Sequence, residues 1–135
     1  MPIPQPREVW YVKDGAIRLH ENKREDKDNR LVLIAASEDL LVARATIINV
    51  IPFSTSGNPD LLSIPIARGY EKTKAGFVPS KDSLALLQWY QPIEIHHFEM
   101  DSGVMGVIEE VCYNSILHTL CTELIGYSDF DLGVE

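Results

Sequence analysis

Short apolar runs, each bounded by polar or turn-forming residues, recur through the first hundred positions of the chain. Glu8 to Lys13 combines valine and aromatic residues that favour a strand. Arg30 to Ala36 is a continuous apolar run of the kind found in strands buried on both faces. Ala45 to Pro52 is rich in β-branched residues and predicts a third strand. Three further strands are predicted over Leu61 to Ala67 (where Pro65 indicates an edge or a bulge), Leu84 to Trp89 and Ile93 to Glu99.

Polar segments separate these runs and predict the connections. Asp14 to Asn29 is a long connection dense in both signs of charge, and such loops are usually functional or mobile. Ser54 to Pro59 is a cluster of turn-forming residues, Lys72 to Lys81 predicts a loop, and Asp101 to Gly103 predicts a turn. The pattern contains no repeat and no low-complexity linker, so it predicts no internal domain boundary.

A helical period appears near the end of the chain. Six apolar residues recur there at spacings of three and four and predict one amphipathic helix, which Gly126 is suited to end; they are Ile108, Val111, Cys112, Ile116, Leu120 and Leu124. Short strands followed by one helix predict a mainly β domain, a small, strongly bent SH3-like β-barrel with a C-terminal helix. We therefore expect a single domain over residues 1–126 and an acidic tail over residues 127–135.

Charge is unevenly distributed along the chain, whose net charge is −8. All twelve Lys and Arg residues fall between Arg7 and Lys81, a stretch that also holds ten acids, whereas Asp82 to Glu135 holds ten acids and no Lys or Arg. Because affinity for nucleic acid comes largely from Lys and Arg, any phosphate-binding surface must be built from the first 81 residues. The last third suits a basic protein partner, or serves only to keep the protein in solution.

The compartment is predicted from the same features. No apolar run approaches the roughly 18 residues that span a bilayer, and the proline-rich start has no apolar signal-peptide core. Cys112 and Cys121 are nine residues apart in the predicted helix, about 13–14 Å, which is too far for a disulfide. We expect a cytoplasmic protein with reduced cysteines and no membrane association.

Four stretches, in order, resemble motifs of the MazF/PemK/Kid toxins of toxin–antitoxin pairs. Pro6 to Val12 is similar to the opening R-G-D/E-V-W pattern, and His20-Glu21 followed by Arg30 resembles the G-H-E-Q loop and the R-P-V-L-V-V strand. Val50 to Asn58 resembles V-P-x-T-S-G-G-N, and Leu86 to Glu94 resembles V-x-C-D-Q-P/I-R-T. The resemblance covers most of residues 6–126, and the order and spacing of the motifs carry it.

This resemblance implies an activity and partners. It implies a homodimeric, sequence-selective endoribonuclease that cleaves single-stranded RNA through the RNA's own 2′-hydroxyl, requires no metal or other cofactor, and is held inactive by a cognate antitoxin. Such a reaction needs a base, an acid and donors for the strained phosphorane. The resemblance assigns catalysis to Arg30, His20, Glu21 and Ser54, and substrate binding to Thr55, Gln88, Tyr90 and Gln91.

Two of these positions leave alternatives open. Gln88 and Tyr90 stand where Kid-like members carry a catalytic arginine and aspartate, and neither can replace the charge at neutral pH. One alternative is therefore a barrel of the same family that has lost its chemistry and acts as a protein- or RNA-binding module. A lesser alternative is a CcdB-like gyrase poison, since that toxin shares the barrel.

The adjacent histidines His96 and His97 raise the possibility of a metal site. In the predicted strand the two side chains would point to opposite faces, and no cysteine or acid stands at metal-ligand spacing from them. The sequence therefore predicts no metal site.

Overall fold

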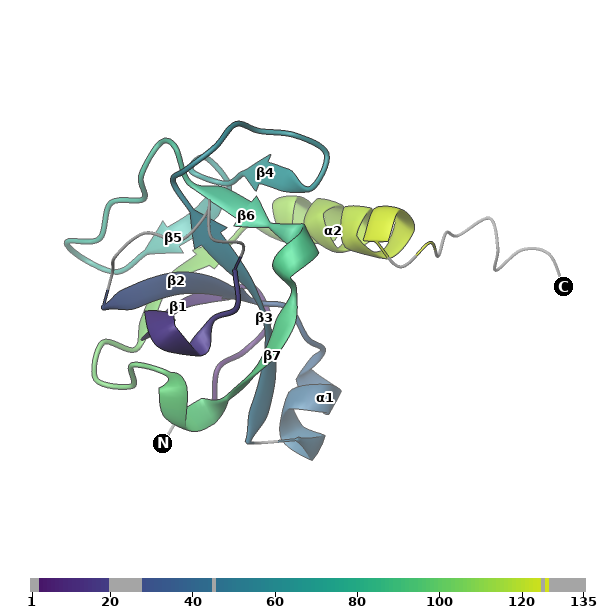
Figure 1. Cartoon of the computed structure of the whole chain (residues 1–135). Helices are drawn as coiled ribbons and strands as arrows, with labels where there is room; N and C mark the ends of the chain where they lie inside the picture. The colour runs from purple at the N-terminus through teal and green to yellow at the C-terminus, as the bar shows by residue number, and fades with distance from the viewer. Residues whose placement is uncertain (1–2, 20–27, 45, 125, 127–135) are drawn as a thin grey trace, which may run out of the picture.

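A bent antiparallel sheet forms the body of the molecule in the computed structural model, which describes residues 3–19, 28–44, 46–124 and 126 (Figure 1). The strands follow the order β4-β6-β3-β2-β1-β8-β5, and β7 also pairs with β3. Their bounds are β1 Glu8–Lys13, β2 Asn29–Ile34, β3 Ile47–Ser54, β4 Ser63–Pro65, β5 Tyr70–Thr73, β6 Leu84–Leu86, β7 Gln91–Glu94 and β8 Val104–Ile108.

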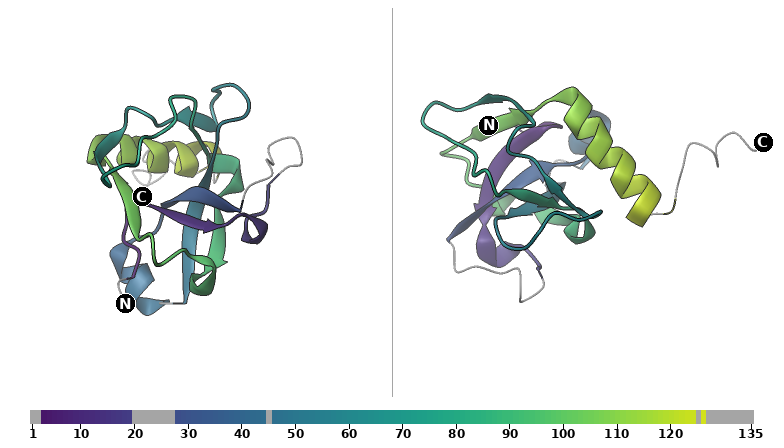
Figure 2. Two further views of the ribbon diagram at one scale, coloured as in Figure 1. Left: turned by 90° about the vertical axis from the view of Figure 1, so that its left-hand side faces the viewer. Right: turned by 90° about the horizontal axis from the view of Figure 1, so that it is seen from above.

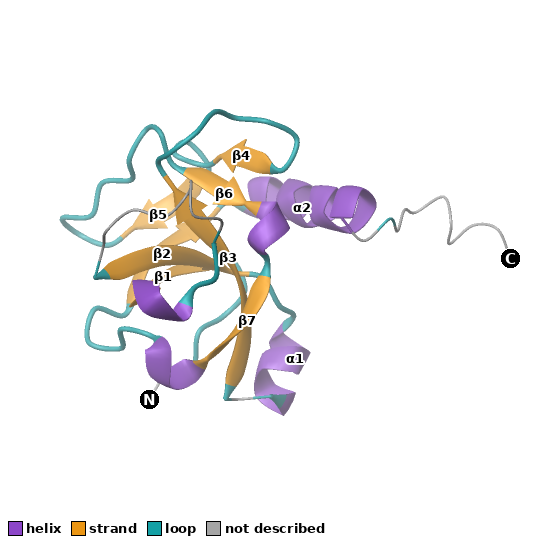
Figure 3. Ribbon diagram, viewed as in Figure 1, coloured by secondary structure: helices purple, strands orange, loops and turns teal. Residues whose placement is uncertain are grey.

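Helical segments form several of the connections between strands, and one helix follows the last strand (Figure 3). The two α-helices lie well apart against the sheet (Figures 1 and 2). Their bounds are α1 Glu38–Ala43 and α2 Glu110–Thr119, and α2 continues as a π-helical turn, η5 Leu120–Leu124. Short 3-10 turns are η1 Asp14–Ala16, η3 Leu87–Trp89 and η4 Ile95–His97. No helix in the described part of the chain is long and apolar enough to cross a membrane.

β3 connects three other strands, because it pairs with β7 along its first half, with β2 in its second half and with β6 at its end. Alternation along the strands divides the buried side chains between two cores. The first core lies under α2 and joins Val9, Leu33, Ile51 and Phe53 to residues of the helix. The second core lies on the other face, where Leu41 of α1 packs with strand residues that include Trp10, Val12, Val32, Ile34 and Ile48.

The structure confirms the main features predicted from the sequence. β1 has the predicted bounds, and Val32, Leu33 and Ile34 of β2 are fully buried, as a strand covered on both faces requires. Pro65 lies in β4, which is the edge strand at one end of the sheet. The mainly β architecture with one C-terminal helix is as predicted.

Other local predictions were wrong. α1, β5 and β8 were not predicted, and the strand expected over Leu84 to Trp89 ends at Leu86. The run from Ile93 to Glu99 is strand only to Glu94 and then turns.

The predicted helix also begins too early. Ile108 belongs to β8, and Val111 is 83% exposed. Ile116 and Leu120 of the predicted stripe are buried, and Tyr113, which was not predicted, completes the buried face.

Candidate functional site

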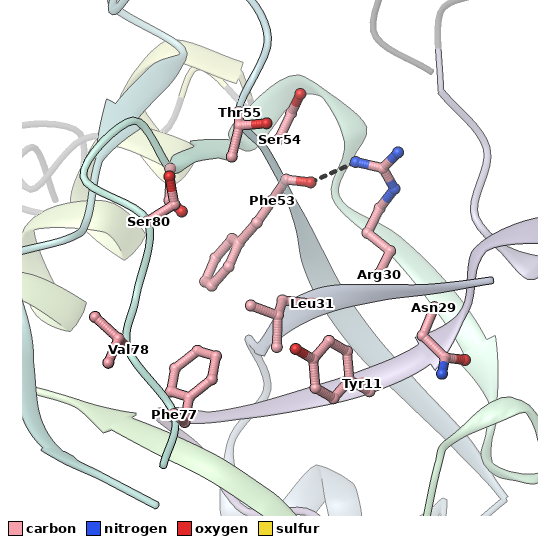
Figure 4. Close-up of a pocket in the computed structure, with 11 residues that line it drawn as sticks. Tyr11, Asn29, Arg30, Leu31, Phe53, Ser54, Thr55, Phe77, Val78 and Ser80 are labelled. Carbon is pink, nitrogen blue, oxygen red and sulfur yellow. Dashed lines mark hydrogen bonds between the residues drawn. The ribbon is translucent and has the colours of Figure 1, made fainter. Parts of the chain in front are cut away.

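A cavity of about 280 Å³ opens where β2 begins and β3 ends (Figure 4). We call it the strand-end cavity. Arg30 is the only charged residue among the described residues that line it; the lining residues are Tyr11, Asn29, Arg30, Leu31, Phe53, Ser54, Thr55, Phe77, Val78, Ser80 and Ser83. A cavity with one cation and no acid in its wall suits an anionic or neutral ligand.

Arg30 is buried, with only 2% of the residue exposed, and two hydrogen bonds hold its guanidinium group in one orientation. Its Nε donates to Oδ1 of the buried Asp14 at 2.6 Å, and Nη1 donates to the carbonyl oxygen of Phe53 at 2.7 Å (Figure 4). The remaining nitrogen, Nη2, is shielded from solvent and has no hydrogen-bond partner among the described residues. A buried donor without an acceptor is costly, so an acceptor oxygen placed at Nη2 would be bound favourably.

Ser54 ends β3 beside this arginine. The register pairs Val32 with Pro52, and continuing it by two residues places Arg30 opposite Ser54. The Ser54 hydroxyl oxygen accepts from the Ser56 N–H at 3.0 Å, which leaves its own proton available for donation. The structure therefore brings together the arginine and the hydroxyl that the sequence motifs singled out, with the exposed Thr55 next to them.

Side chains from both faces of the β1–β2 pair line the strand-end cavity. Val12 pairs with Arg30 and Tyr11 with Leu31, so alternation directs Arg30 toward the second core and Tyr11 and Leu31 toward the first. Phe53 lies on the same face as Leu31. The strand-end cavity therefore joins a polar half at Arg30 and Ser54 to an apolar, aromatic half on the other face.

Gln91 is buried and has a structural bonding pattern. Its Oε1 accepts from the backbone N–H of Arg18 at 2.8 Å, and its Nε2 donates to the carbonyl oxygens of Arg18 and Trp89 at 2.9 and 2.8 Å. The side chain thus fastens the segment after η1, the turn that carries Asp14, to the start of β7.

Gln88 and Tyr90 lie outside the strand-end cavity. Gln88 is exposed on η3, and the Tyr90 hydroxyl accepts from Nδ2 of Asn49 at 3.0 Å. Tyr90 lines a separate cavity between α1 and α2, together with Tyr113 and Leu120. His20 and Glu21 lie outside the described residues, so the structure does not place them.

Asp14 was not singled out by the sequence motifs. Because Gly15 follows it, Asp14 has the sequence of an ordinary turn residue. Only the structure shows that it is buried, at 5% exposure, and paired with Arg30. Phe77 was also missed, because it stands in a segment whose composition predicts a loop. An aromatic residue within an otherwise polar loop was the available signal.

The two adjacent histidines lie differently from their predicted strand positions. Because they lie in the turn η4, their ring centroids are 4.0 Å apart, and Nδ1 of His96 is 3.2 Å from Oε2 of Glu94. The described residues nevertheless contain no group of three or more His, Cys, Asp or Glu side chains arranged to hold a metal ion.

The fold is similar to that of one class of known protein, the MazF toxins. The chain matches a chain of the MazE-MazF crystal structure from Deinococcus radiodurans with a TM-score of 0.63 and 11% identity, covering 95% of this chain and 100% of that one. It matches the Mycobacterium tuberculosis toxin MazF-mt6 with a TM-score of 0.60 and 14% identity, covering 88% and 97% of the two chains. No family model and no curated protein matches the sequence. The resemblance to MazF toxins is thus confirmed at the level of the fold.

Proposed function

We propose that the protein is a MazF-like toxin that cleaves single-stranded RNA through the RNA's own 2′-hydroxyl, without a metal ion. The observation that carries the proposal is the Arg30 guanidinium, which Asp14 and the Phe53 carbonyl hold in place while Nη2 has no partner among the described residues. Nη2 is shielded from solvent, so a non-bridging phosphate oxygen would reach it after a local shift of the side chains around it, and would then supply that acceptor. Ser54 stands beside it to donate to a second oxygen.

Each catalytic role follows from the charge that develops during the reaction. The 2′-oxygen bonds to phosphorus and gives its proton to a base, while the 5′-oxygen leaves and receives a proton from an acid. Arg30 and Ser54 would stabilise the extra negative charge of the intervening phosphorane. His20 and Glu21 are proposed as acid and base, because imidazole and carboxyl groups can donate and accept protons.

The other residues are assigned supporting roles in this proposal. Asp14 and Gln91 would position Arg30, Asp14 by direct contact and Gln91 by fastening the segment that follows η1. Thr55 is exposed on the lining of the strand-end cavity and would contact the substrate. Gln88 and Tyr90 would reach only nucleotides farther along the RNA, because they lie on or next to η3.

We also propose the partners and the compartment. The protein would act in the cytoplasm as a homodimer, under the control of an antitoxin. The run of ten acids without a Lys or Arg from Asp82 onward suits a basic antitoxin segment. Size-exclusion chromatography with light scattering checks the dimer, and co-expression with the neighbouring gene product checks the pairing.

A ribonuclease assay in EDTA tests the proposed activity directly. The wild-type protein is expected to cleave a mixed-sequence single-stranded RNA. Arg30→Lys keeps the charge but loses the planar fork of donors, so we expect cleavage to fall at least about 100-fold. RNA that stays intact over a wide range of enzyme concentrations contradicts the proposal, as does undiminished cleavage by Arg30→Lys.

The control must separate lost chemistry from lost folding. Arg30→Ala alone would remove the cation beside the buried Asp14 carboxylate, at a cost of about 3–5 kcal/mol. The double variant Asp14→Asn/Arg30→Met removes both charges at similar volume and is expected to stay folded but inactive. A folded double variant that retains activity would exclude Arg30 as the phosphate-binding group.

A second candidate function is an RNA- or protein-binding module without catalysis. Two observations favour it: Gln88 and Tyr90 replace charged residues of the family pattern, and Arg30 is already paired with Asp14. This candidate predicts a stable complex with a partner protein or an RNA band shift, with no cleavage product. The same EDTA assay, analysed on both native and denaturing gels, distinguishes the two functions.

A further inference from the structure

We propose that the apolar half of the strand-end cavity binds one nucleobase of the RNA, and that this base stacks on Phe77. The inference rests on the proposed function, because it names what lies beside the phosphate held by Arg30. Its first support is separate from the catalytic residues, since it comes from the aromatic side chains on the opposite face of the strand pair.

Three aromatic residues from separate parts of the chain line this half of the cavity. Tyr11 comes from β1, Phe53 from β3 and Phe77 from the loop after β5 (Figure 4). The cavity of about 280 Å³ lies just below the 300–1,000 Å³ typical of small-molecule pockets. It therefore suits one planar group rather than a larger ligand.

The loop is built so that Phe77 has a defined position. The Phe77 N–H donates to the carbonyl oxygen of Lys74 at 2.9 Å, and the turn between them needs Gly76 at φ +86°. Lys74 is itself fastened to β8, since its N–H donates to the Met105 carbonyl at 2.8 Å. The Phe77 ring packs against Tyr70, with ring centroids 6.1 Å apart. A half-buried aromatic ring held in this way offers a fixed platform for stacking.

The chemistry around Phe77 favours a nucleobase over an apolar peptide side chain. The same cavity contains the Arg30 guanidinium, so a base in the apolar half would lie on the nucleotide whose phosphate meets the arginine. The hydroxyls of Ser80 and Ser83 also line the cavity and can bond to the polar edge of a base. An aliphatic side chain could form no hydrogen bond with these hydroxyls.

The rim of the cavity carries an exposed apolar residue that a bound ligand would cover. Val78 follows Phe77 and is 85% exposed, although it is a large apolar residue. No acidic residue lies among the described lining residues, so the phosphates of an approaching RNA meet no like charge there. An RNA strand crossing the ends of β2 and β3 would place its phosphate on one face and its base on the other.

The test compares two probes that cannot be cleaved because they lack free 2′-hydroxyls. One is a fluorescent 2′-O-methyl oligonucleotide of mixed sequence, and the other has the same backbone with abasic sites throughout. In an anisotropy titration, Phe77→Ala is expected to weaken binding of the first probe about tenfold. It should leave binding of the abasic probe unchanged. Phe77→Trp should retain binding of the first probe, whereas Phe77→Leu, which keeps the bulk but loses the ring face, should behave like alanine.

Matched controls make each result decisive. Val111→Ala removes an apolar side chain that is 83% exposed on α2, away from the cavity, and should change neither titration. If Arg30→Lys weakens both probes but Phe77→Ala weakens neither, the base-stacking proposal is wrong and the proposed function stands. If the wild-type protein binds neither probe, the RNA-based function itself fails. An acidic peptide with apolar side chains is the competing occupant, and Phe77-dependent binding of that peptide alone would also overturn the proposal.

Discussion

Arg7 adopts a backbone conformation that most residues avoid. Its φ is +72°, and it is the one non-glycine residue with positive φ among the described residues. The residue stands at the second position of the pattern similar to R-G-D/E-V-W, where the toxins carry glycine. Left-handed backbone costs an L-residue roughly 1–2 kcal/mol, which glycine avoids. The backbone at position 7 therefore suits the glycine of that pattern better than it suits the arginine of this chain.

We therefore predict that Arg7→Gly raises stability relative to Arg7→Ala by about 1 kcal/mol. Both variants lose the partly exposed ion pair between Arg7 and Glu71, with Nη1 and Oε1 3.5 Å apart, so their difference isolates the backbone. Urea unfolding followed by circular dichroism gives the two free energies. Equal stability of the two variants would show that the backbone at this position is not strained.

The residues of the candidate site differ in how well the sequence could predict them. Arg30 and Ser54 were found because each stands at a strand end within a recognisable motif, and the strands bring their ends together. Asp14 was not found, because a buried acid and an exposed turn acid have the same local sequence. The pairing of Asp14 with Arg30 spans 16 residues, and local patterns carry no information about such contacts.

At the scale of elements, the clearest difference from the sequence pattern is α1. Its six residues are too few for a helical period to stand out, so the segment looked like a simple break after β2. Ser37 does carry a local signal: its hydroxyl oxygen accepts from the Leu40 N–H at 3.1 Å and caps the helix. The helix matters for packing because Leu41 is almost fully buried in the second core.

Loss of that cap should destabilise the protein. We predict that Ser37→Ala lowers the free energy of unfolding by about 1 kcal/mol, whereas Ser37→Asp, which can still accept the hydrogen bond, keeps it near the wild-type value. Thermal or urea unfolding of the three proteins provides the measurement. Equal losses in both variants would mean that the cap does not hold α1.

The strand β8 shows why the C-terminal region was predicted wrongly. Val104 to Ile108 leads directly into the helix, and its last residue fits the helical spacing by coincidence. Gly106 in the middle of this strand has a packing reason, since a Cβ there would lie 2.7 Å from the Tyr70 ring. The close contact with a strand far away in the sequence explains the glycine at position 106, and no local sequence pattern indicates that contact.

Tyr113 connects α2 to the sheet and makes stability depend on alkaline pH. Burial, with a smaller effect from Tyr90, raises the pKa of Tyr113 to about 12 from an ordinary value of 10. The unfolded chain therefore loses this proton near pH 10, while the folded chain keeps it until about pH 12. Between these values the unfolded state binds fewer protons, so stability falls as pH rises, by up to about 1.4 kcal/mol per pH unit.

The measurement is urea unfolding at pH 9, 10.5 and 11.5 for the wild-type protein and Tyr113→Phe. The variant should lose stability less steeply above pH 10. Tyr70, whose pKa burial also raises, is present in both proteins, so the difference between the slopes belongs to Tyr113. Parallel curves would contradict the prediction.

At the scale of the whole molecule, the distribution of charge limits how the proposed RNA substrate could be bound. The net charge is −8, and the Lys and Arg residues end at Lys81. Binding must therefore depend on few phosphate contacts, supplemented by the uncharged contacts of the strand-end cavity. A general attraction along an extended RNA is not expected from this surface.

We predict a shallow salt dependence of RNA binding. Each neutralised phosphate contributes about −0.7 to the slope of log K against log salt for single strands, so we expect a slope of about −1 to −2. Anisotropy titrations between 50 and 300 mM KCl, with the 2′-O-methyl probe, measure it; these concentrations are roughly those over which the effect is resolved. A slope steeper than about −4 would indicate a broad basic surface that the charge distribution does not provide.

The two ends of the connection between β1 and β2 are tied together independently of what lies between them. Asp14 bonds to Arg30 through its side chain and to the Asp28 carbonyl through its backbone N–H, at 2.6 and 3.0 Å. Closing a longer loop costs little more than closing a short one, about 0.6 kcal/mol for each doubling of length. Insertions, deletions and substitutions inside this connection can therefore accumulate while the barrel and Arg30 stay in place. A lineage built on this scaffold can vary the length and sequence of this connection around His20 and Glu21 without evolving a new fold.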